Sequence, residues 1–457
     1  MKAAFINIAL RPDSPRRRLP VGLGFILTAL QKADYEFDLI DMEIDRLDMQ
    51  QLEQILSKTQ YDVYGFGCII TGFKWVMQIS SLIKRINPAA IIIAGNSVAT
   101  SIPEILLNHT KVDIAVLGEG DITITELFNA LEHKKDLSLI AGIAFKQDEK
   151  IIYTKKRAII KNVDSLGFPE WDIFQLDKYY EFGRVNANVF TVDDDITSFP
   201  LNSARGCPYN CTFCYHVFKG EIYRKYSEDA IVGEMKRLHD KYGCNYISFW
   251  DELTFVNDKS VEDMIARLSQ LNFKINWDAV SRGDLFRKEH VGLIKEMRNL
   301  GAENIAFSLE NASPEILKAM KKKLSVKRVI EQSHALWEGG VTPLTSIIFG
   351  YPQETPETIE LTLKVCEECN IYPSVGFLLP LPGTDMYDWA IKNGFIKDEV
   401  EYFLKIADRQ DLHVNLTSMT DNQFTETVTE KLEALAKKQG LQLDSVLKTV
   451  TYQRPKK

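Results

Sequence analysis

The chain has 457 residues, of which 45% are hydrophobic and 26% charged, and its formal net charge is −8. This length exceeds one ordinary core and predicts two or three globular domains. The acidic balance, without a long basic run, argues against a dedicated nucleic-acid surface, and no apolar stretch approaches the roughly 20 residues that cross a bilayer. The first residues resemble a strand and not a signal peptide. With seven cysteines, we therefore expect a reducing, cytoplasmic location.

From its start to about residue 140 the chain alternates short apolar runs with helical patterns. This alternation predicts an α/β domain with a doubly wound, Rossmann-like parallel sheet, whose ligands bind at the carboxyl ends of the strands. The expected strands are Ala3–Ala9, Glu36–Ile40, Val63–Cys68, Ile91–Ala94 and Ile114–Leu117.

The loops after these strands are rich in small residues: Thr71-Gly72, Gly95-Asn96-Ser97 and Gly118-Glu119-Gly120. Small residues let the backbone approach a large planar or phosphate-bearing ligand closely. Any doubly wound domain has such loops, so this pattern alone does not name the ligand.

Three further regions follow. Residues 141–198 are expected to form a connector that begins with a hairpin. Residues 199–385 show six strand–helix units, which predict a partial (βα)6 TIM-type barrel with its chemistry at the carboxyl ends of the strands. Residues 386–457 are expected to be mainly helical. The expected barrel strands are Leu201–Ala204, Tyr246–Phe249, Ile275–Ala279, Asn304–Ser308, Thr345–Phe349 and Ser374–Leu378.

Three cysteines, Cys207, Cys211 and Cys214, follow the first barrel strand within eleven residues that read Arg205-Gly-Cys-Pro-Tyr-Asn-Cys-Thr-Phe-Cys-Tyr215. Closely spaced thiolates on one loop suit an iron–sulfur cluster, and three ligands leave one iron open for chemistry. A zinc site completed by His216 is the alternative. Structural zinc sites usually take two separated ligand pairs, however, and no second pair lies nearby.

The other cysteines have a simpler interpretation. Cys366 and Cys369 form a CxxC within a helical pattern and lack further cysteines nearby. They are expected to be packed thiols, and we expect the same of Cys68 and Cys244.

The CxxxCxxC loop, with Phe213 before its last cysteine, resembles the signature of radical S-adenosylmethionine (SAM) enzymes. Further segments resemble this family at the expected strand ends and in the expected order. They are Phe249-Trp-Asp-Glu-Leu-Thr-Phe255 after the second strand, Ser308-Leu-Glu-Asn-Ala-Ser-Pro-Glu315 after the fourth, Phe349-Gly-Tyr-Pro-Gln-Glu354 after the fifth and Leu379-Pro-Leu-Pro-Gly-Thr384 after the sixth.

This resemblance implies a 4Fe–4S cluster held by Cys207, Cys211 and Cys214, with the amine and carboxylate of SAM on the fourth iron. One-electron cleavage of SAM would give a 5′-deoxyadenosyl radical, and the electron implies a donor such as flavodoxin or ferredoxin. The barrel would position this chemistry and exclude water. No catalytic residue beyond the cluster ligands is assigned.

The resemblance also implies contacts to SAM. Asp251 and Glu252 are expected to accept hydrogen bonds from its ammonium group, and Arg282 to pair with its carboxylate, because a guanidinium fork matches a carboxylate. Glu310 is expected to accept the ribose hydroxyls. The expected contacts are completed by Phe213, Phe349 and Leu378, which would flank the adenine, and by Ser308.

Each of these residues has a structural alternative. Asp251 or Glu252 could cap the helix that begins near Asn257. Arg282 could form an exposed salt bridge, and Glu310 could favour the helix start that follows it. The apolar residues could belong to the core.

The first domain is similar to the N-terminal cobalamin-binding domain of one branch of radical SAM proteins, on the segments Leu19–Gly24, Asp38–Asp41, Gly95-Asn96 and Leu117–Gly120. This similarity implies cobalamin contacts at Thr71, Gly95, Gly118 and Glu119. The loop Leu10–Gly22 holds no histidine, which implies base-off cobalamin without a histidine ligand. A glycine pair is replaced by Gly95-Asn96, and a domain that keeps the fold but has lost the corrinoid is the alternative.

Together these resemblances, which cover about residues 1–385, imply a cobalamin-dependent methyltransferase acting on an unactivated carbon of a small molecule. An oxidative cyclase or rearrangement enzyme, resembling the anaerobic magnesium-protoporphyrin ester cyclase, would share every motif. A non-catalytic corrinoid- or metal-binding sensor and a tRNA- or protein-modifying enzyme are further alternatives, and the acidic charge weighs against the last.

Overall fold

The structure is a computed structural model that describes residues 1–11, 17–180, 196–443 and 445–447. The chain divides into two compact units. The first contains Met1–Gly183, His216–Glu221 and Asp398–Ala407, and the second contains Arg184–Tyr215, Ile222–Lys397 and Asp408–Lys457.

The first unit is built on a seven-stranded sheet with the order β2-β1-β3-β4-β5-β6-β7. The first five of these strands are parallel, which confirms the doubly wound prediction, and β6 and β7 extend the sheet as an antiparallel hairpin. The sequence had placed this hairpin in the connector. The strands are β1 (Ala3–Asn7), β2 (Asp38–Asp41), β3 (Val63–Gly67), β4 (Ile91–Gly95), β5 (Ile114–Val116), β6 (Ile143–Gln147) and β7 (Lys150–Tyr153).

Helices cover this sheet because their apolar faces match its buried strands. A capping box of Asp48 and Gln51 starts α3, and Phe5 of β1 stacks on Phe128 of α7 with ring centroids 6.0 Å apart. The helices are α1 (Val21–Lys32), α2 (Met42–Asp45), α3 (Met49–Lys58), α4 (Phe73–Ile86), α5 (Asn96–Ser101), α6 (Pro103–His109), α7 (Gly120–Glu132) and α16 (Glu399–Lys405). Short 3-10 turns are η1 (Ile70–Gly72), η2 (Leu137–Leu139), η3 (Val163–Leu166) and η4 (Trp171–Ile173).

The segment after the hairpin folds onto the same unit. The backbone N–H of Glu170 donates to Thr28 Oγ1 at 2.8 Å, and Tyr179 OH donates to the buried Asp41 Oδ2 at 2.6 Å. From the carboxyl-terminal part of the chain, Phe403 of α16 packs edge-on against Phe73 of α4, with centroids 5.9 Å apart. Both segments therefore contribute to the core of this unit.

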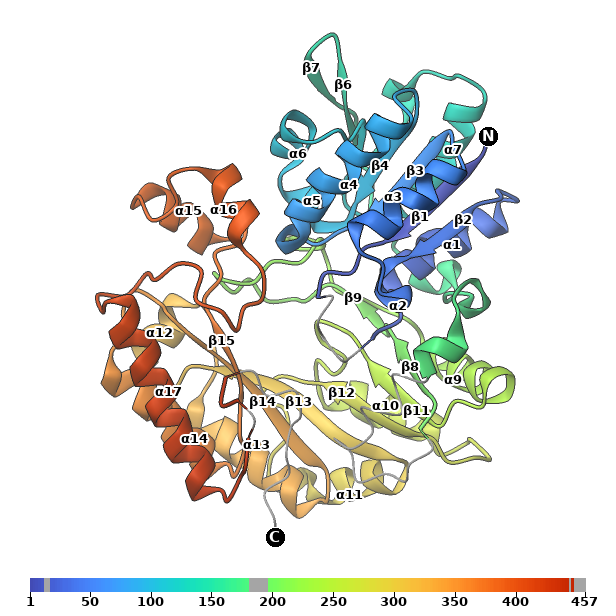
Figure 1. Ribbon diagram of the computed structural model, residues 1–457. Coiled ribbons are helices and arrows are strands. Elements are labelled where there is room, and N and C mark those ends of the chain that lie inside the picture. Colours follow the sequence, from blue (N-terminus) through green and yellow to red (C-terminus); the bar gives the residue numbers. More distant parts are fainter. Residues whose placement is uncertain (12–16, 181–195, 444, 448–457) are drawn as a thin grey trace. The chain divides into compact units, whose positions relative to one another are not determined.

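The second unit is a curled half-barrel of six parallel strands with the order β15-β14-β13-β12-β11-β8, which confirms the partial-barrel prediction. Figure 1 shows helices such as α10, α11, α13 and α14 along the outer side of this sheet. The strands are β8 (Ser198–Leu201), β11 (Tyr246–Phe249), β12 (Asn276–Val280), β13 (Ala302–Glu310), β14 (Thr342–Phe349) and β15 (Ser374–Phe377), with a small antiparallel pair, β9 (Ala204–Arg205) and β10 (Arg224–Lys225).

The helices of this unit begin at clear signals. Asn257 and Ser260 form a capping box at α10, and Thr355 and Thr358 form another at α14. The helices are α9 (Glu228–Tyr242), α10 (Asp258–Leu268), α11 (Val291–Asn299), α12 (Pro314–Ala319), α13 (Val326–Glu338), α14 (Pro356–Glu368), α15 (Asp385–Lys392) and α17 (Asp421–Lys438), with the 3-10 turn η6 (Lys288–His290). No helix in the described ranges is long and apolar enough to span a membrane.

Side chains alternate along the half-barrel strands. Fully buried residues such as Ile247, Trp277 and Ile305 are separated by half-buried polar ones such as Ser248 and Asp278. Ser248 Oγ donates to Asp278 Oδ1 at 3.0 Å across neighbouring strands. The sheet therefore has one apolar face and one face with a polar row.

Gly301, just before β13, should tolerate no side chain. Its φ is +98°, and an added Cβ would stand 2.0 Å from the carbonyl oxygen of Ile275. We expect Gly301→Ala to destabilise the unit by at least about 2 kcal/mol. Gly292→Ala is the matched control, because its Cβ meets nothing within 4 Å in α11; it should stabilise by about 0.5–1 kcal/mol. Melting temperatures of the two variants check this, and equal shifts would contradict it.

Candidate functional site

The loop that carries the three cysteines leaves β8 at its carboxyl end and is closed at its base by the β9–β10 pair. Thr212, between two of the cysteines, fixes it. Its N–H donates to Met320 O at 3.0 Å, and its hydroxyl lies 2.8 Å from Tyr351 OH. Its carbonyl accepts from Met386 N at 3.1 Å. The loop is thus fastened to the segments after α12 and β14 and to α15.

The three thiols are free, with Cys211 buried and Cys207 and Cys214 half-buried. Burial raises the pKa of each, and that of Cys214 rises to about 12, with further contributions from the charges of Cys211, Glu310 and Cys207. The three sulfurs therefore lie within electrostatic reach of one another. A bound metal deprotonates such thiols, because coordination outweighs the desolvation of the thiolate.

The donor set fits an iron–sulfur cluster. In the described ranges no group of three or more His, Cys, Asp or Glu side chains is arranged to hold a single metal ion. The three cysteines with His216, the zinc site that the sequence left as an alternative, are therefore not arranged in this way. In a 4Fe–4S cluster each thiolate binds its own iron, so the sulfurs need not converge on one point.

Asp251 and Glu252 follow β11 and have different environments. Asp251 accepts hydrogen bonds from Ser203 N at 2.8 Å, Ser203 Oγ at 2.5 Å and Ala204 N at 3.0 Å, and burial raises its pKa to about 6. Its oxygens thus hold the start of the cysteine loop. The cap of α10 is Asn257, so neither carboxylate caps this helix.

Glu252 is exposed to solvent, and yet desolvation raises its pKa, against the lowering effect of the Gly206 N–H and the Arg205 charge. Glu252 is therefore the member of the pair that a ligand can reach.

Arg282 has partners within the protein. Its Nη2 donates to the carbonyls of Lys322 at 3.0 Å and Lys323 at 2.7 Å, and its Nε pairs with Asp284 at 3.1 Å. Its guanidinium carbon lies 4.0 Å from the centroid of the Tyr209 ring, in the cysteine loop. Arg282 is therefore half-buried and connects the Lys322–Lys323 backbone to the cysteine loop. It does not form the exposed salt bridge of the alternative interpretation.

Glu310 ends β13 at a register shift, with a φ of +63°. A bulge of this kind re-aims a side chain. Its Oε1 accepts from Lys322 Nζ at 3.0 Å, whereas its Oε2 is buried and has no hydrogen-bond partner among the described residues. A buried acceptor without a donor is costly, and a ligand hydroxyl would satisfy it. The cap of α12 is Ser313, so Glu310 is not needed there.

The remaining residues expected at SAM lie at the strand ends. Phe349 and Leu378 expose 0% and 3% of their surface, so they pack in the core behind those ends. Ser308 accepts a hydrogen bond from Ser346 Oγ at 2.9 Å. Phe213 is half-buried and edge-on to Tyr351, and is the aromatic member of the set that a ligand can reach.

Two residues that the sequence analysis missed belong to this region. Lys322 pairs with Glu310, as described above. It was missed because the run Lys321–Lys323 has the pattern of a solvated surface segment. Glu354 is fully buried and accepts from Asn311 Nδ2 at 3.2 Å and Gly350 N at 3.2 Å. It thereby joins the ends of β13 and β14. Its place at the end of the Phe349–Glu354 segment was the available signal.

In the first unit, open space lies beside the backbone where the sequence predicts cobalamin. A Cβ added at Gly95, the last residue of β4, or at Gly118, after β5, would meet no atom within 4 Å. Thr71 is half-buried in η1, after β3. Glu119 is buried and accepts from Ile160 N at 2.9 Å, so its carboxylate supports the segment after the hairpin. The backbone at Gly95 and Gly118 is therefore unobstructed where a Cβ would stand.

Residues 201–366 match the model of the radical SAM superfamily, and residues 18–128 match that of the B12 binding domain. The chain therefore carries a B12-binding domain followed by a radical SAM domain. The descriptions of the two models name SAM and B12. Solved structures that share the fold have a [4Fe-4S] cluster, SAM or cobalamin bound.

Several curated proteins resemble this radical SAM enzyme over most of its length. It is 29% identical to the uncharacterized methyltransferase PH0819 of Pyrococcus horikoshii, over 87% of this chain and 85% of that protein. It is 24% identical to a cytidylyl-2-hydroxyethylphosphonate methyltransferase of Streptomyces wedmorensis, over 90% and 85%. It is 26% identical to the anaerobic magnesium-protoporphyrin IX monomethyl ester cyclase of Cereibacter sphaeroides, over 84% of this chain and 61% of that longer protein.

Two solved structures share the fold. The radical SAM methyltransferase TsrM from Kitasatospora setae has a TM-score of 0.69 at 17% identity, over 86% of this chain and 77% of that one. The cobalamin-dependent radical enzyme OxsB has a TM-score of 0.67 at 18% identity, over 97% and 62%. These likenesses confirm the order of the two folds along the chain.

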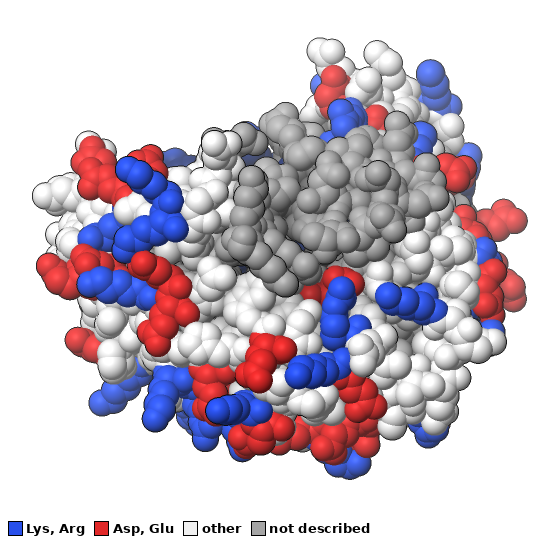
Figure 2. Space-filling model, turned by 90° about the horizontal axis from the view of Figure 1, so that it is seen from below, with Lys and Arg blue, Asp and Glu red and all other residues white. Residues whose placement is uncertain are grey.

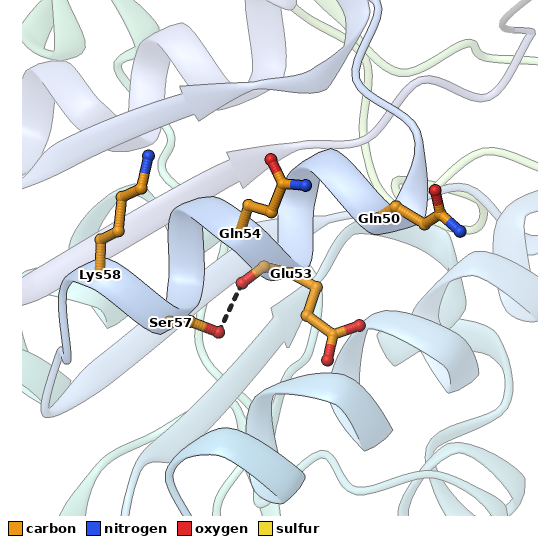
Figure 3. A pocket seen from close by; sticks show the side chains of 5 residues that line it. All are labelled: Gln50, Glu53, Gln54, Ser57 and Lys58. Carbon is orange, nitrogen blue, oxygen red and sulfur yellow. Dashed lines mark hydrogen bonds between the residues drawn. The ribbon is translucent and has the colours of Figure 1, made fainter.

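A pocket on α3 lies apart from the strand ends. It is lined by one helix, through Gln50, Glu53, Gln54, Ser57 and Lys58, whose side chains are polar (Figure 3). Ser57 Oγ donates to the Glu53 carbonyl at 2.8 Å, within the helix. No residue of the cysteine or glycine loops lines it, and we assign it no role in the chemistry.

The buried Glu354 predicts a pH dependence of stability. Burial raises its pKa from 4.5 to about 7, so the folded enzyme keeps a proton that the unfolded chain releases between these values. Its contribution to stability is full below pH 4.5 and is lost as the pH rises through 7. Glu354→Gln imitates the protonated form and should flatten this dependence, relative to wild type, between about pH 5 and about pH 8. Melting temperatures at both values measure it.

The exposed Glu357→Gln is the matched control, because it lies three residues further along the chain and outside the buried network. It should leave the difference between the two pH values as it is in wild type. The same slope for Glu354→Gln and wild type would contradict the role of Glu354.

Proposed function

We propose that this enzyme methylates an unactivated carbon of a small molecule, using SAM and cobalamin. The observation that carries the proposal is the pairing of two features at one end of the half-barrel. Three free thiols share a loop, and one buried carboxylate oxygen of the nearby Glu310 has no donor among the residues that the structure describes. The first is suited to a cluster and the second to a hydroxyl-bearing ligand. The methyltransferase names of two relatives support methyl transfer as the outcome.

For the SAM site we propose roles that follow from accessibility. Cys207, Cys211 and Cys214 hold the cluster. Glu252, the accessible carboxylate, accepts from the ammonium group of SAM, and Glu310 Oε2 accepts from its ribose. Phe213 lies against the adenine.

The buried residues of the predicted set would support the SAM site without contacting SAM. Asp251 fixes the start of the cysteine loop and Arg282 clamps the loop through Tyr209. Phe349, Leu378 and Ser308 keep the ends of β13, β14 and β15 in register. These residues would set the geometry of the SAM site without being exposed to it.

For cobalamin we propose that Thr71, Gly95 and Gly118 form the surface on which the corrin lies, with Glu119 as its support. Ile69 and Ile122, beside these loops, expose 43% and 41% of their surface, and an apolar ring face would cover them. The sequence of the loop Leu10–Gly22 contains no histidine that could bind cobalt. Residues 12–16 of this loop lie outside the described residues. We therefore retain base-off cobalamin without a protein ligand from this loop.

When bound, the cluster with SAM supplies a carbon-centred radical and cobalamin supplies the methyl carrier. The residues of the chain bind, orient and shield these groups. We propose flavodoxin or ferredoxin as the electron donor, the cytoplasm as the location, and a small molecule as the substrate. Figure 2 shows Lys and Arg interspersed with Asp and Glu over the face drawn, in keeping with a net charge of −8 and not with a nucleic-acid substrate.

Oxidative cyclisation is the second candidate, because the relatives include the Cereibacter sphaeroides cyclase. The two reactions differ in what becomes of SAM. Methyl transfer yields S-adenosylhomocysteine together with 5′-deoxyadenosine, whereas cyclisation yields 5′-deoxyadenosine alone.

Product analysis tests the function. Anaerobically reconstituted enzyme, given a reductant and hydroxocobalamin, should convert SAM to both nucleoside products. Cys211→Ala should abolish 5′-deoxyadenosine formation, because the cluster loses one of its three proposed ligands. Cys244→Ala, at a fully buried thiol in the same unit, is the matched control and should retain cleavage. Continued cleavage by Cys211→Ala would refute the cluster-based mechanism.

Retention of cobalamin tests the first unit. Gly95 has φ −131° and ψ −169°, which suit a β-branched residue, and its Cβ points into open space. Gly95→Val should therefore fold normally and yet lose most of the corrinoid that wild type retains through gel filtration, as measured by absorbance. Its melting temperature and its SAM cleavage should stay unchanged. Equal retention by variant and wild type would remove this strand end from the proposed corrin site.

A further inference from the structure

The residues that follow the cysteine loop, His216–Glu221, belong to the first unit and not to the half-barrel. The backbone N–H of Lys219 donates to the carbonyl of His216 at 2.9 Å, so these residues form a turn. At the end of this turn, Glu221 pairs with Lys156 Nζ at 2.6 Å. The turn is therefore connected to the segment that follows β7.

This connection places the turn at the edge of the sheet where the parallel strands end. Ile143 of β6 lies opposite Val116, the last residue of β5. Beyond this pair, the N–H of Gly142 donates at 2.9 Å to the carbonyl of the residue before Lys156. The turn that Lys156 holds therefore lies at the edge where β5 ends and where Gly118 of the proposed corrin surface follows.

Lys219 brings an ammonium group into this turn without a partner. Its Nζ is buried and has no hydrogen-bond partner among the described residues, and no carboxylate of those residues pairs with it. The acid in the turn, Glu221, is already paired with Lys156. The Nδ1 of His216 is likewise buried and without a partner among the described residues. Burial of an unpaired ammonium group is costly, so this position favours a bound counter-charge.

The chemistry of Lys219 limits what such a ligand can be. An ammonium group has three hydrogen-bond donors and no acceptor, so its ligand must supply acceptors. A neutral amide would supply an acceptor but would leave the charge uncompensated. A carboxylate or phosphate group supplies both the acceptors and the opposite charge, and hydrogen bonds between ionised groups are the stronger kind.

We propose that Lys219 is the cation of a binding site for an oxyanion, a phosphate or carboxylate group, at the strand ends of the first unit. Two ligands could bring such a group, namely an anionic small-molecule substrate and the phosphodiester of cobalamin. The choice between them rests on the proposed function, which supplies both ligands. The presence of an oxyanion site does not depend on it.

Inorganic phosphate tests the site in the full chain, reconstituted anaerobically with its cluster. Melting temperatures are measured while phosphate replaces chloride at constant ionic strength. Phosphate should stabilise wild type saturably, because it binds the folded state. Lys219→Met should bind phosphate at least about 10-fold more weakly, as expected for a lost charged hydrogen bond. In chloride this variant should melt no lower than wild type, because it removes an unpaired buried charge.

Lys156 supplies the matched control. Its side chain is 83% exposed and its partner belongs to the same turn, so Lys156→Gln removes a cation near the site and leaves the buried one in place. It should keep the affinity for phosphate within about 2-fold of wild type. Lys219→Arg keeps a charge and should bind phosphate more tightly than Lys219→Met. Wild type that phosphate does not stabilise, or equal affinities of wild type and Lys219→Met, would overturn the proposal.

Corrinoid binding separates the two ligands. Cobinamide has the corrin ring of cobalamin but lacks the phosphodiester and the nucleotide base. If the phosphodiester occupies the site, cobalamin should abolish the stabilisation by phosphate, and Lys219→Met should weaken cobalamin about 10-fold more than cobinamide. If a substrate occupies it, cobalamin-loaded enzyme should keep that stabilisation, and Lys219→Met should bind both corrinoids as wild type does. Wild type that binds neither corrinoid would contradict the proposed function, while the phosphate experiment would still decide the role of Lys219.

Discussion

The carboxylate of Asp251 determines where the cysteine loop begins, and the rest of the proposed SAM site depends on that point. It stands just after β11 and accepts hydrogen bonds from the backbone N–H groups of Ser203 and Ala204, just after the neighbouring β8. Burial alone would make this charge unfavourable, as its raised pKa shows. The N–H donors offset that penalty and in doing so fix the two strand ends relative to each other.

Glu354 has the same structural role at the strand pair β13 and β14. It joins Asn311, just beyond β13, to Gly350, just beyond β14. Two buried carboxylates therefore hold the loops after two pairs of neighbouring strands, β8 with β11 and β13 with β14. This separates the task of holding the site from the task of binding, which falls to the accessible Glu252 and to the free oxygen of Glu310.

The sequence predicted the strands well where burial is continuous. The strand Tyr246–Phe249 has the expected bounds, because an apolar run identifies it directly. The prediction was wrong where hydrogen bonds to a side chain replace those between neighbouring strands. The first barrel strand was expected at Leu201–Ala204, but it is Ser198–Leu201 and shares only Leu201 with that range. Ser203 and Ala204, beyond its end, donate to Asp251. Cys366 and Cys369 are buried thiols, as predicted.

Neighbours in sequence explain why the roles of side chains were harder to predict than the elements. Asp251 and Glu252 are adjacent carboxylates. Asp251 accepts hydrogen bonds from Ser203 and Ala204 because β8 lies beside β11, whereas Glu252 stays accessible to solvent. Lys321 and Lys322 likewise look the same in sequence. One pairs with Asp385 on the surface and the other with the buried Glu310, and the residues on each side of Lys322 have left-handed backbones. Residue type and spacing locate this site, but the charge that each side chain meets is set by contacts between distant segments, such as Arg282 with the backbone of Lys322.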